Sequence, residues 1–453
     1  MIIPDQYPDR SVCVIGLGYV GLTLAATMAN IGFRVRGIEI RDNVVKQLRA
    51  GQPHFHEPGL ADLLSRVTES GALEVHASIP ADCDAQVYII TVGTPLGPNG
   101  RARLDMIEHA AGEVAAAMRP GALVIMRSTM RLGTTRNVVL PILDRRGFAY
   151  DLAFCPERTL EGVAIKELRT LPQIVGGADL QACVRAAQLF QFITPTTLRV
   201  HDLETAEMIK LVDNAQRDVH FAFSNEVARM CDAIGISAMD VITAGRLGYP
   251  RTNLALPGPV GGPCLEKDPY ILAEGLESYG LTPEITMTAR RLNERQPEES
   301  MAALHAASQR MSGFPSRPVI AMLGLAFKGQ PATDDLRGTM ARPILAALRR
   351  HFDGAEWRGY DAVVPPDAFG EFSLKPCATL ETATRGANLV VITNNHPAFA
   401  AMPIESLSQG MGHPALIYDF WNHFEARRLR LSGNRAYMAL GNHAAANRQG
   451  APA

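Results

Sequence analysis

The sequence lacks the features that mark membrane, secreted and nucleic-acid-binding proteins. In its 453 residues no apolar run approaches the roughly 18 residues of a membrane-spanning helix. The start, MIIPDQYPDR, has no apolar core of the kind found in secretory signals. The formal net charge is −2, so no basic excess favours nucleic acid or an anionic membrane as a partner. We therefore expect a soluble globular protein with neither kind of partner.

Paired cysteines are also absent. The seven cysteines are spread singly along the chain, and none forms a CxxC spacing. This pattern argues against a disulfide framework and against a zinc site, so no metal is predicted. Because unpaired cysteines are typical of reducing compartments, the expected location is the cytoplasm.

What the sequence does contain is an alternation of apolar, strand-like runs with helical periodicity. Strands are predicted at 11–16, 34–40, 85–92, 122–129 and 151–157, and again at 319–327, 388–393 and 415–420. Such alternation is typical of parallel, doubly wound α/β sheets. We therefore predict α/β domains at 1–200 and 316–440, which are expected to be distant copies of one architecture. An all-helical domain at 201–310 lies between them, and the 441–453 tail is expected to be disordered.

The stretch GLGYVG at 16–21 follows the first predicted strand and opens a helix. Gly16 permits a tight turn, Gly18 lets a pyrophosphate approach the backbone, and Gly21 lets helix and strand pack closely. The helix N-terminus adds N–H groups and a positive dipole end for the anion. Glu39, 18 residues after Gly21, is placed to bind the ribose hydroxyls and favours NAD over NADP. The alternative is a glycine-rich turn in an ordinary α/β fold.

Loops after two later strands indicate the same cofactor site. Thr94 in TVGTPLGP and Thr129 in RSTMRLGT each follow a predicted strand, and open α/β sheets bind ligands at the carboxyl ends of their strands. Capping of the next helix is the alternative for both threonines. The predicted cofactor contacts also include Tyr19, Val20 and Arg41, although the charge of Arg41 weakens the preference for NAD.

The stretch PGPVGGPCLEKDPY at 257–270 places one cysteine among prolines and glycines. Because Pro and Gly are typical of loops, Cys264 is predicted on a shaped loop. Gly261 and Gly262 let a ligand come close, and the cation of Lys267 is expected to lower the pKa of the thiol. These features favour a nucleophile, and the alternative is a buried thiol that packs as a small apolar side chain.

Polar residues of two further stretches are candidates for catalysis. In KLVDNAQRD, the positions of Lys210, Asn214, Arg217 and Asp218 share one helix face. Lysine and asparagine one turn apart make a donor pair that can polarise a carbonyl or hold an oxyanion. Glu157 in CPERTLEG follows a strand and a proline and is a candidate base. The alternatives are a solvated helix face and an acid near a helix N-terminus.

Together these groups indicate oxidation of an alcohol to an acid. A nicotinamide cofactor removes a hydride from an alcohol, and a thiol attacks the aldehyde that results. The thiohemiacetal gives up a second hydride and becomes a thioester, from which water releases the acid. A simple alcohol dehydrogenase needs no such cysteine.

Six motifs, in order, resemble the UDP-glucose/GDP-mannose dehydrogenase family of nucleotide-sugar 6-dehydrogenases over about residues 11–422. They are GLGYVGL, STM, CPERTLEG, KLVDNAQRD, PGPVGGPCLEKDP and GLAFKGQPATDDLR. The resemblance implies an α/β fold, in which two Rossmann-like domains with parallel sheets flank an all-helical central domain with a long dimerising helix. It also implies NAD on the N-terminal domain, a UDP-sugar on the C-terminal domain, a homodimer, and a product used in polysaccharide biosynthesis.

The resemblance also implies roles for individual residues. The catalytic roles fall to Cys264 as nucleophile, Lys210 and Asn214 as the oxyanion and proton-handling pair, Asp268 and Thr129 as holders of water, and Glu157 as the base of thioester hydrolysis. Glu157, Lys210 and Asn214 also belong to the implied substrate site. Its other members are Arg158, Arg217, Tyr249, Arg251, Asn253, Gly261, Phe327 and Lys328, and further cofactor contacts are implied at Lys267 and Arg337.

The motifs differ in the sugar that they favour. NAQRDVHFAFSNE and YPRTNL, with Arg217 and Arg251, resemble the branch that acts on UDP-N-acetylhexosamines such as UDP-N-acetylmannosamine. Pro263 and Lys267 resemble the UDP-glucose branch, so a UDP-glucose 6-dehydrogenase remains the alternative. Two other classes are a two-electron β-hydroxyacid dehydrogenase, which lacks the cysteine loop and the third domain, and a catalytically silent nucleotide-sugar sensor.

Overall fold

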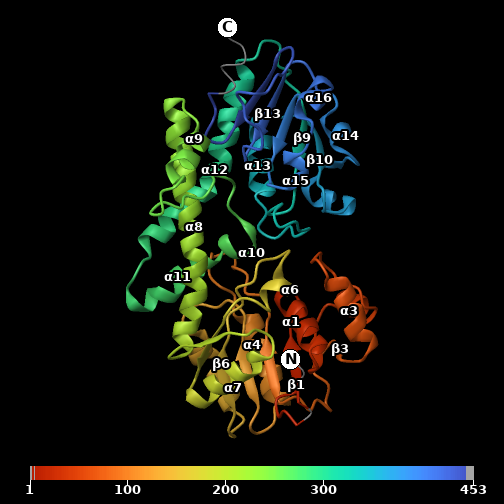
Figure 1. Cartoon of the computed structure of the whole chain (residues 1–453), viewed down its shortest axis with the longest axis vertical. Coiled ribbons are helices and arrows are strands. Elements are labelled where there is room, and N and C mark those ends of the chain that lie inside the picture. The colour runs from red at the N-terminus through yellow and green to blue at the C-terminus, as the bar shows by residue number, and fades with distance from the viewer. Residues whose placement is uncertain (1–2, 5, 445–453) are drawn as a thin grey trace. The chain divides into compact units, whose positions relative to one another are not determined.

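The computed structural model describes residues 3–4 and 6–444, and the chain divides into two compact units. The first unit comprises Met1–Asn214 and Lys267–Pro283, and the second comprises Ala215–Glu266 and Glu284–Ala453. The long helix α8 (Leu203–Ile234) passes from the first unit into the second (Figure 1). Among the described residues, no helix has both the length and the apolar composition that a membrane crossing requires.

An eight-stranded sheet forms the centre of the first unit, in the order β3-β2-β1-β4-β5-β6-β7-β8. The strands are β1 (Ser11–Ile15), β2 (Arg34–Ile38), β3 (Leu73–His76), β4 (Val87–Ile90), β5 (Leu123–Met126), β6 (Asp151–Phe154), β7 (Gln173–Gly177) and β8 (Thr197–Arg199). Neighbours are parallel except β6 and β7, where Ala153 pairs with Gly177 in an antiparallel register. An antiparallel neighbour needs no crossover, so the segment between them, with the short helix α6 (Ala164–Glu167), leaves β6 and enters β7 at the same end of the two strands.

Helices cover both faces of this sheet. They are α1 (Tyr19–Asn30), α2 (Asp42–Arg49), α3 (Leu60–Glu69), α4 (Asp105–Ala117), the π-helical turn η1 (Thr135–Val139), α5 (Leu140–Asp144) and α7 (Leu180–Gln191), followed by α8, α11 (Asp268–Leu276) and the 3₁₀ turn η2 (Glu277–Tyr279). Alternate residues of β1 enter different cores: Val12 and Val14 pack with α1 and α3, whereas Cys13 and Ile15 pack with α4. A strand buried on both faces explains the continuous apolar run of the sequence.

The second unit contains a six-stranded sheet in the order β11-β10-β9-β12-β13-β14, with all pairs parallel. Its strands are β9 (Val319–Leu323), β10 (Glu356–Tyr360), β11 (Lys375–Pro376), β12 (Leu389–Ile392), β13 (Ala415–Asp419) and β14 (Arg435–Ala439). Its helices are α9 (Ala238–Arg246), α10 (Gly262–Leu265), α12 (Glu284–Gln309), α13 (Ala341–His351), η3 (Pro366–Phe372), α14 (Leu380–Thr384), α15 (Pro397–Ala400) and α16 (Ile404–Gln409). As in the first unit, alternate residues of the first strand enter opposite cores: Ile320 on one side and Ala321 on the other. The predicted α/β class is confirmed in both units.

Residues 201–310 contain helices and loops and no strand, as their periodicity predicts. Beyond the second sheet, Asp232 of α8 accepts hydrogen bonds from the N–H groups of Gly441 (3.0 Å) and His443 (2.8 Å). The expectation of a disordered tail is therefore wrong at its first residues, because the partly buried Asp232 carboxylate on α8 fixes their backbone. The rest of the predicted tail lies outside the described residues.

Candidate active site

The turn between β1 and α1 has the geometry of a phosphate-binding loop. Gly16 adopts a φ of +91°, and a Cβ on Gly21 would lie 1.9 Å from the Gly16 carbonyl oxygen. A Cβ on Gly18 would meet no atom of the described residues within 4 Å. Since α1 begins at Tyr19, its first N–H groups have no partner within the helix. The turn therefore fits the pyrophosphate of a dinucleotide.

The side chain of Tyr19 serves a buried network beside this turn. Its hydroxyl donates to Glu57, and the N–H of Gly162 lies 2.6 Å from the same carboxylate. The second oxygen of Glu57 accepts from the N–H of Ala164 at 2.8 Å. Tyr19 thus joins the glycine turn to the CPERTLEG segment, while Val20 is half-buried on the first turn of α1. No motif in the sequence indicates a role for Glu57.

The acid predicted to bind ribose is buried and ionised. Glu39 is 5% exposed, and its carboxylate accepts from the backbone N–H and the guanidinium of Arg41 at 2.9–3.0 Å. Burial acts to raise the pKa of Glu39, but the bonds from Arg41 outweigh it and hold that pKa below its usual value. Arg41 therefore keeps the carboxylate charged, at the carboxyl end of β2.

Thr94 and Thr129 are joined to each other. The Thr94 hydroxyl donates to the carbonyl oxygen of Thr129 at 2.5 Å, and Thr94 is 4% exposed. The helices that follow are capped elsewhere, at Leu104 and Thr134. The capping alternative is thus wrong for both threonines, which instead tie together two loops at the carboxyl edge of the sheet.

Glu157 is held by an arginine that the sequence analysis did not single out. Arg127, at the end of β5, donates from Nε (3.1 Å) and a terminal nitrogen (2.5 Å) to one carboxylate oxygen. The N–H groups of Arg158 and Thr159 donate to the other oxygen at 2.8 Å. Burial acts to raise the pKa of Glu157, but Arg127 and the N–H of Thr159 outweigh it and lower the pKa. Glu157 is thus a buried, ionised carboxylate, and it is not a helix cap because α6 begins at Ala164.

Four more of the predicted residues form hydrogen bonds on or beside α8, within the first unit. Lys210 Nζ donates to the carbonyl oxygen of Glu157 at 2.5 Å. One turn later, Asn214 Nδ2 donates to Asp268 at 2.6 Å, and Lys267 Nζ donates to the other oxygen of Asp268 at 2.9 Å. Asp268 is fully buried. The two members of the proposed oxyanion pair thus have separate partners: Lys210 bonds the backbone of Glu157, and Asn214 bonds the carboxylate of Asp268.

A second buried acid on α8 fixes the loop that follows Thr129. Glu207 accepts from the N–H groups of Gly133 (2.5 Å) and Thr135 (2.9 Å) and from the Thr135 hydroxyl (2.5 Å). Burial raises the pKa of Glu207 to about 7. An acid among apolar neighbours on a predicted helix face was the signal that could have identified it.

Cys264 lies in the second unit, on the short helix α10. The prediction of a shaped loop is wrong at this position, because Pro263 suits the first turn of a helix and Gly262 supplies the left-handed entry with a φ of +90°. Glycine is needed at positions 261 and 262 because neighbouring atoms leave no room for a Cβ. A Cβ on Gly262 would lie 2.5 Å from the ring of Phe327, and a Cβ on Gly261 would lie 2.4 Å from the Gly338 carbonyl oxygen. Cys264 itself is half-buried.

The remaining predicted residues form smaller groups. The guanidinium of Arg251 lies over the ring of Tyr249 at 4.6 Å and donates to its hydroxyl at 3.1 Å. The carbonyl oxygen of Asn253 bonds the imidazole of His220. Elsewhere in the second unit, Lys328 Nζ lies 5.2 Å from the ring of Phe327, and Arg337 pairs with Asp335 at 2.6 Å.

Arg158 and Arg217 are two arginines with different surroundings. Arg158 donates to the Pro172 carbonyl oxygen at 2.8 Å and to Asp213 at 3.4 Å. Arg217 is exposed, whereas Asn214 and Asp218 on neighbouring positions are buried. The four positions share one face of α8 as predicted, and Arg217 lies at the exposed edge of that face.

Sequence comparison assigns the family. The chain matches the NAD binding domain of the UDP-glucose/GDP-mannose dehydrogenase family over residues 10–194, its central domain over 204–295 and its UDP binding domain over 321–426. The chain belongs to this family. It is an NAD-dependent nucleotide-sugar dehydrogenase, so the family resemblance, the oxidoreductase class and the cofactor predicted from the motifs are confirmed.

Individual relatives agree in sequence and fold. The UDP-N-acetyl-D-mannosamine dehydrogenase of Pyrococcus horikoshii is 34% identical over 412 residues, 90% of this chain and 94% of that protein. The Campylobacter jejuni enzyme of the same name is 35% identical over 75% of this chain and 83% of its own. The solved structure of the Pyrococcus horikoshii UDP-D-ManNAc dehydrogenase has a TM-score of 0.86 and 32% identity, covering 96% of this chain and 100% of that one.

Proposed function

We propose that the chain oxidises the C6 hydroxyl of a UDP-N-acetylhexosamine to the uronic acid, a four-electron oxidation in which two molecules of NAD each accept one hydride. The observation that carries the sugar assignment is the 34% identity to a UDP-N-acetyl-D-mannosamine dehydrogenase over 90% of the chain. The alternative, UDP-glucose, is favoured by Pro263 and Lys267 and by likeness to the Pyrobaculum islandicum UDP-glucose dehydrogenase structure. That structure has a TM-score of 0.84 and 26% identity, covering 96% of this chain and 99% of that one.

The proposed chemistry passes through a covalent bond to Cys264. NAD, when bound, supplies the hydride acceptor for both oxidations. Loss of a hydride and a proton converts the C6 alcohol to an aldehyde, and the Cys264 thiolate adds to the aldehyde carbon as the oxygen takes a proton. Loss of a second hydride and of that proton leaves a thioester. Water then forms the new C–O bond and gives up its two protons, the C–S bond breaks, and the uronate and the thiolate are released.

Residues of the first unit are proposed to manage charge and protons in these steps. Lys210 and Asn214, one helical turn apart, stabilise the developing oxyanion at C6. Asp268, in contact with Asn214, and Thr129 hold the water. Glu157 stays ionised beside Arg127, as a base of thioester hydrolysis must be to accept a proton. Four peptide bonds join Cys264 to Asp268, so the chain itself keeps their Cα atoms within about 14 Å.

The binding residues are proposed by their positions in the family motifs. For NAD they are Gly16, Gly18, Tyr19, Val20, Gly21, Glu39, Arg41, Thr94, Thr129, Lys267 and Arg337. For the UDP-sugar they are Glu157, Arg158, Lys210, Asn214, Arg217, Tyr249, Arg251, Asn253, Gly261, Phe327 and Lys328. The charges of the arginines and lysines among them suit a diphosphate.

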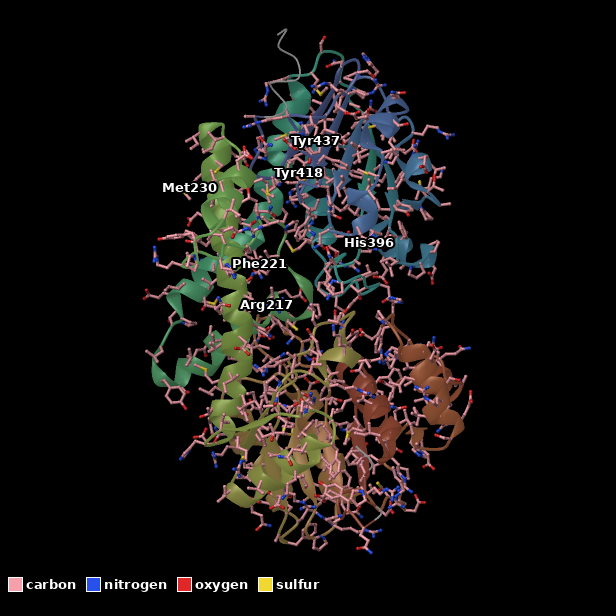
Figure 2. All side chains as sticks on the ribbon, viewed as in Figure 1. Arg217, Phe221, Met230, His396, Tyr418 and Tyr437 are labelled. Carbon is pink, nitrogen blue, oxygen red and sulfur yellow. The ribbon has the colours of Figure 1, made fainter. Side chains whose placement is uncertain are left out.

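We also propose that the chain forms a homodimer through α8. Val212, Phe223, Met230 and Ile234 are 44–69% exposed and recur at i, i+11, i+18 and i+22, which places them on one side of the helix. Figure 2 shows Arg217, Phe221 and Met230 along α8. A second copy would bury this apolar stripe, and sedimentation at a monomer's mass would contradict the proposal. Also proposed are a cytoplasmic location and the division into domains at 1–200, 201–310 and 316–440.

The test is to count NADH formed per UDP-sugar consumed, for wild type, Cys264→Ser and the matched control Cys377→Ser, whose thiol is also half-buried. UDP-N-acetylmannosamine, UDP-N-acetylglucosamine, UDP-glucose and UDP-galactose serve as substrates. We expect two NADH per N-acetyl sugar for wild type and Cys377→Ser, and at most one for Cys264→Ser, which can form the aldehyde but no thioester. The outcomes that follow refer to wild type. Faster turnover of UDP-glucose would support the alternative substrate. A single NADH would indicate a two-electron dehydrogenase, and binding without NADH would indicate a sensor.

A further inference from the structure

Four buried polar residues of α8 and α12 form a hydrogen-bond network with the backbone of the segment that carries Cys264. Asp218 and Asn225 come from α8, and Arg290 and Asn293 come from α12. None of the four is more than 1% exposed. Polar and charged groups at such depth persist only where hydrogen bonds compensate them, so their partners identify what they hold.

Their partners are main-chain groups on both sides of Cys264. Arg290 donates from one terminal nitrogen to the Leu265 carbonyl oxygen (2.9 Å) and from the other to the Val260 carbonyl oxygen (3.0 Å). Asn225 exchanges two hydrogen bonds with Gly258, donating to its carbonyl oxygen (3.0 Å) and accepting from its N–H (2.9 Å). The planar fork of a guanidinium spans two carbonyls that a lysine ammonium cannot reach together.

The other two residues hold these donors in place. Asp218 accepts from Arg290 at 2.9 Å and from Asn293 at 2.9 Å, and Asn293 accepts from Asn225 at 3.0 Å. The network is therefore continuous from the ion pair to the Gly258 backbone. A buried ion pair is often no more stabilising than an apolar pair of similar volume. A gain in stability therefore does not explain an arginine at position 290. The hydrogen bonds that it donates to two carbonyl oxygens do explain it.

We propose that Arg290, oriented by Asp218, is a positioning residue for the nucleophile: it fixes the backbone on both sides of Cys264, so that the thiol captures the aldehyde before the aldehyde escapes. This inference rests on the proposed function, in which Cys264 forms the covalent intermediate. Arg290 touches neither substrate nor cofactor in this role. It acts through the Val260 and Leu265 carbonyl oxygens, which determine where α10 begins and ends.

The variants are Arg290→Met, Arg290→Lys and the double variant Asp218→Leu/Arg290→Met. In the double variant no charge is left unpaired, so it is expected to fold even if Arg290→Met alone does not. Arg291→Met is the matched control, because Arg291 is the neighbouring arginine on α12 and is exposed. Thermal unfolding and NAD binding are measured for each, since a merely structural defect would change both.

The deciding measurement is the ratio of NADH formed to UDP-sugar consumed, with hydroxylamine present to trap free aldehyde. We expect kcat to fall about 100-fold in the double variant, as for a reacting group displaced by about 1 Å. The ratio should fall from two towards one, the trapped aldehyde should account for the difference, and Arg290→Lys should recover only part of the loss. A ratio of two with unchanged kcat in the folded double variant would overturn the inference. If wild type itself yields one NADH or none, the proposed function has failed and the inference with it.

Discussion

The two α/β sheets of this chain begin with the same turn but use it differently. In the first sheet Gly16 has a φ of +91°, its N–H donates to the end of β2, and the Thr91 hydroxyl donates to the carbonyl oxygens of Ile15 and Gly16. In the second sheet Gly324 has a φ of +97°, its N–H donates to the end of β10, and the Thr393 hydroxyl donates to the corresponding two carbonyl oxygens. The same turn therefore follows the first strand in both.

The sequences after these turns, GLGYVG and GLAFKG, differ where a dinucleotide would approach. Ala326 stands at the position of Gly18, so the second sheet already carries a Cβ in the corresponding place. α1 begins within the first motif, at Tyr19, whereas α13 begins only at Ala341. The second turn therefore lacks a helix N-terminus for a phosphate.

The acid after the second strand also differs. Glu39 turns to Arg41 and leaves the first turn open. In the second sheet, Asp361 bonds the N–H groups of Leu325 (2.5 Å) and Ala326 (3.2 Å). A carboxylate of the chain thus occupies the donors that would otherwise serve a ligand anion. The same topology therefore forms an anion site when the acid bonds another side chain, as Glu39 does. It forms a turn without free donors when the acid bonds the turn's own N–H groups, as Asp361 does.

The largest expected effect comes from removing that acid. Asp361 also accepts from the N–H groups of Val363 and Val364 at 2.8 and 3.0 Å, so Asp361→Ala leaves four backbone donors without their carboxylate. At about 1 kcal/mol or more for each, the free energy of unfolding should fall by about 4 kcal/mol, with unchanged NAD affinity. Denaturant unfolding and calorimetric NAD titration check this. Glu39→Ala should weaken NAD binding and leave the free energy of unfolding nearly unchanged. Weaker NAD binding in Asp361→Ala would contradict the comparison.

A somewhat smaller effect is expected from the acids of α8, one in each unit. The folded-state pKa of Glu207 is about 7, raised by burial from 4.5, so folding favours the protonated form. The contribution of Glu207 to the free energy of unfolding is complete below about pH 4.5 and is lost as the pH rises through 7. The loss amounts to about 3 kcal/mol. Glu207→Gln should remove this fall from a profile of unfolding free energy against pH.

Asp232, in the second unit, provides the control for that profile. Burial raises its pKa from 3.8 to about 6, so Asp232→Asn should flatten the profile between about pH 4 and 6 and leave the fall between 6 and 7. If the two variants flatten the same window, the assignment of the higher transition to Glu207 is wrong.

The smallest effect is expected when one residue of the first turn is replaced by its counterpart in the second turn. Gly18→Ala gives the first turn the residue of the second, in a space where a Cβ meets no described atom within 4 Å. Stability should therefore be unchanged, while displaced pyrophosphate contacts raise the Kd for NAD about 10- to 100-fold. Gly112→Ala, on α4 and also in open space, is the control for thermal unfolding and NAD titration. An unchanged Kd would mean that the pyrophosphate does not approach Gly18.

Much of the fold could be predicted because its signals are local. The apolar runs of β1, β4 and β5 and the glycines at 16, 18 and 21 report their own surroundings, since a buried strand needs apolar side chains on both faces. Cys264 and Glu157 were identified as candidates in the same way, by type and neighbouring residues. Glu57 and Arg127 were not, because a buried charge is recognised by its partner, and each partner lies more than 25 residues away in the sequence.

The sequence by itself thus determined the two doubly wound sheets, the helical segment between them, the nucleotide turn and the motifs that assign the family. The tertiary structure decided what each polar group does. Asp361 bonds the N–H groups of its own turn, whereas Glu39 bonds Arg41. Arg290 bonds the backbone of the Cys264 segment. The physical reason is that a hydrogen bond depends on distances of about 3 Å between atoms that folding brings together, whereas apolar periodicity is already present in consecutive residues.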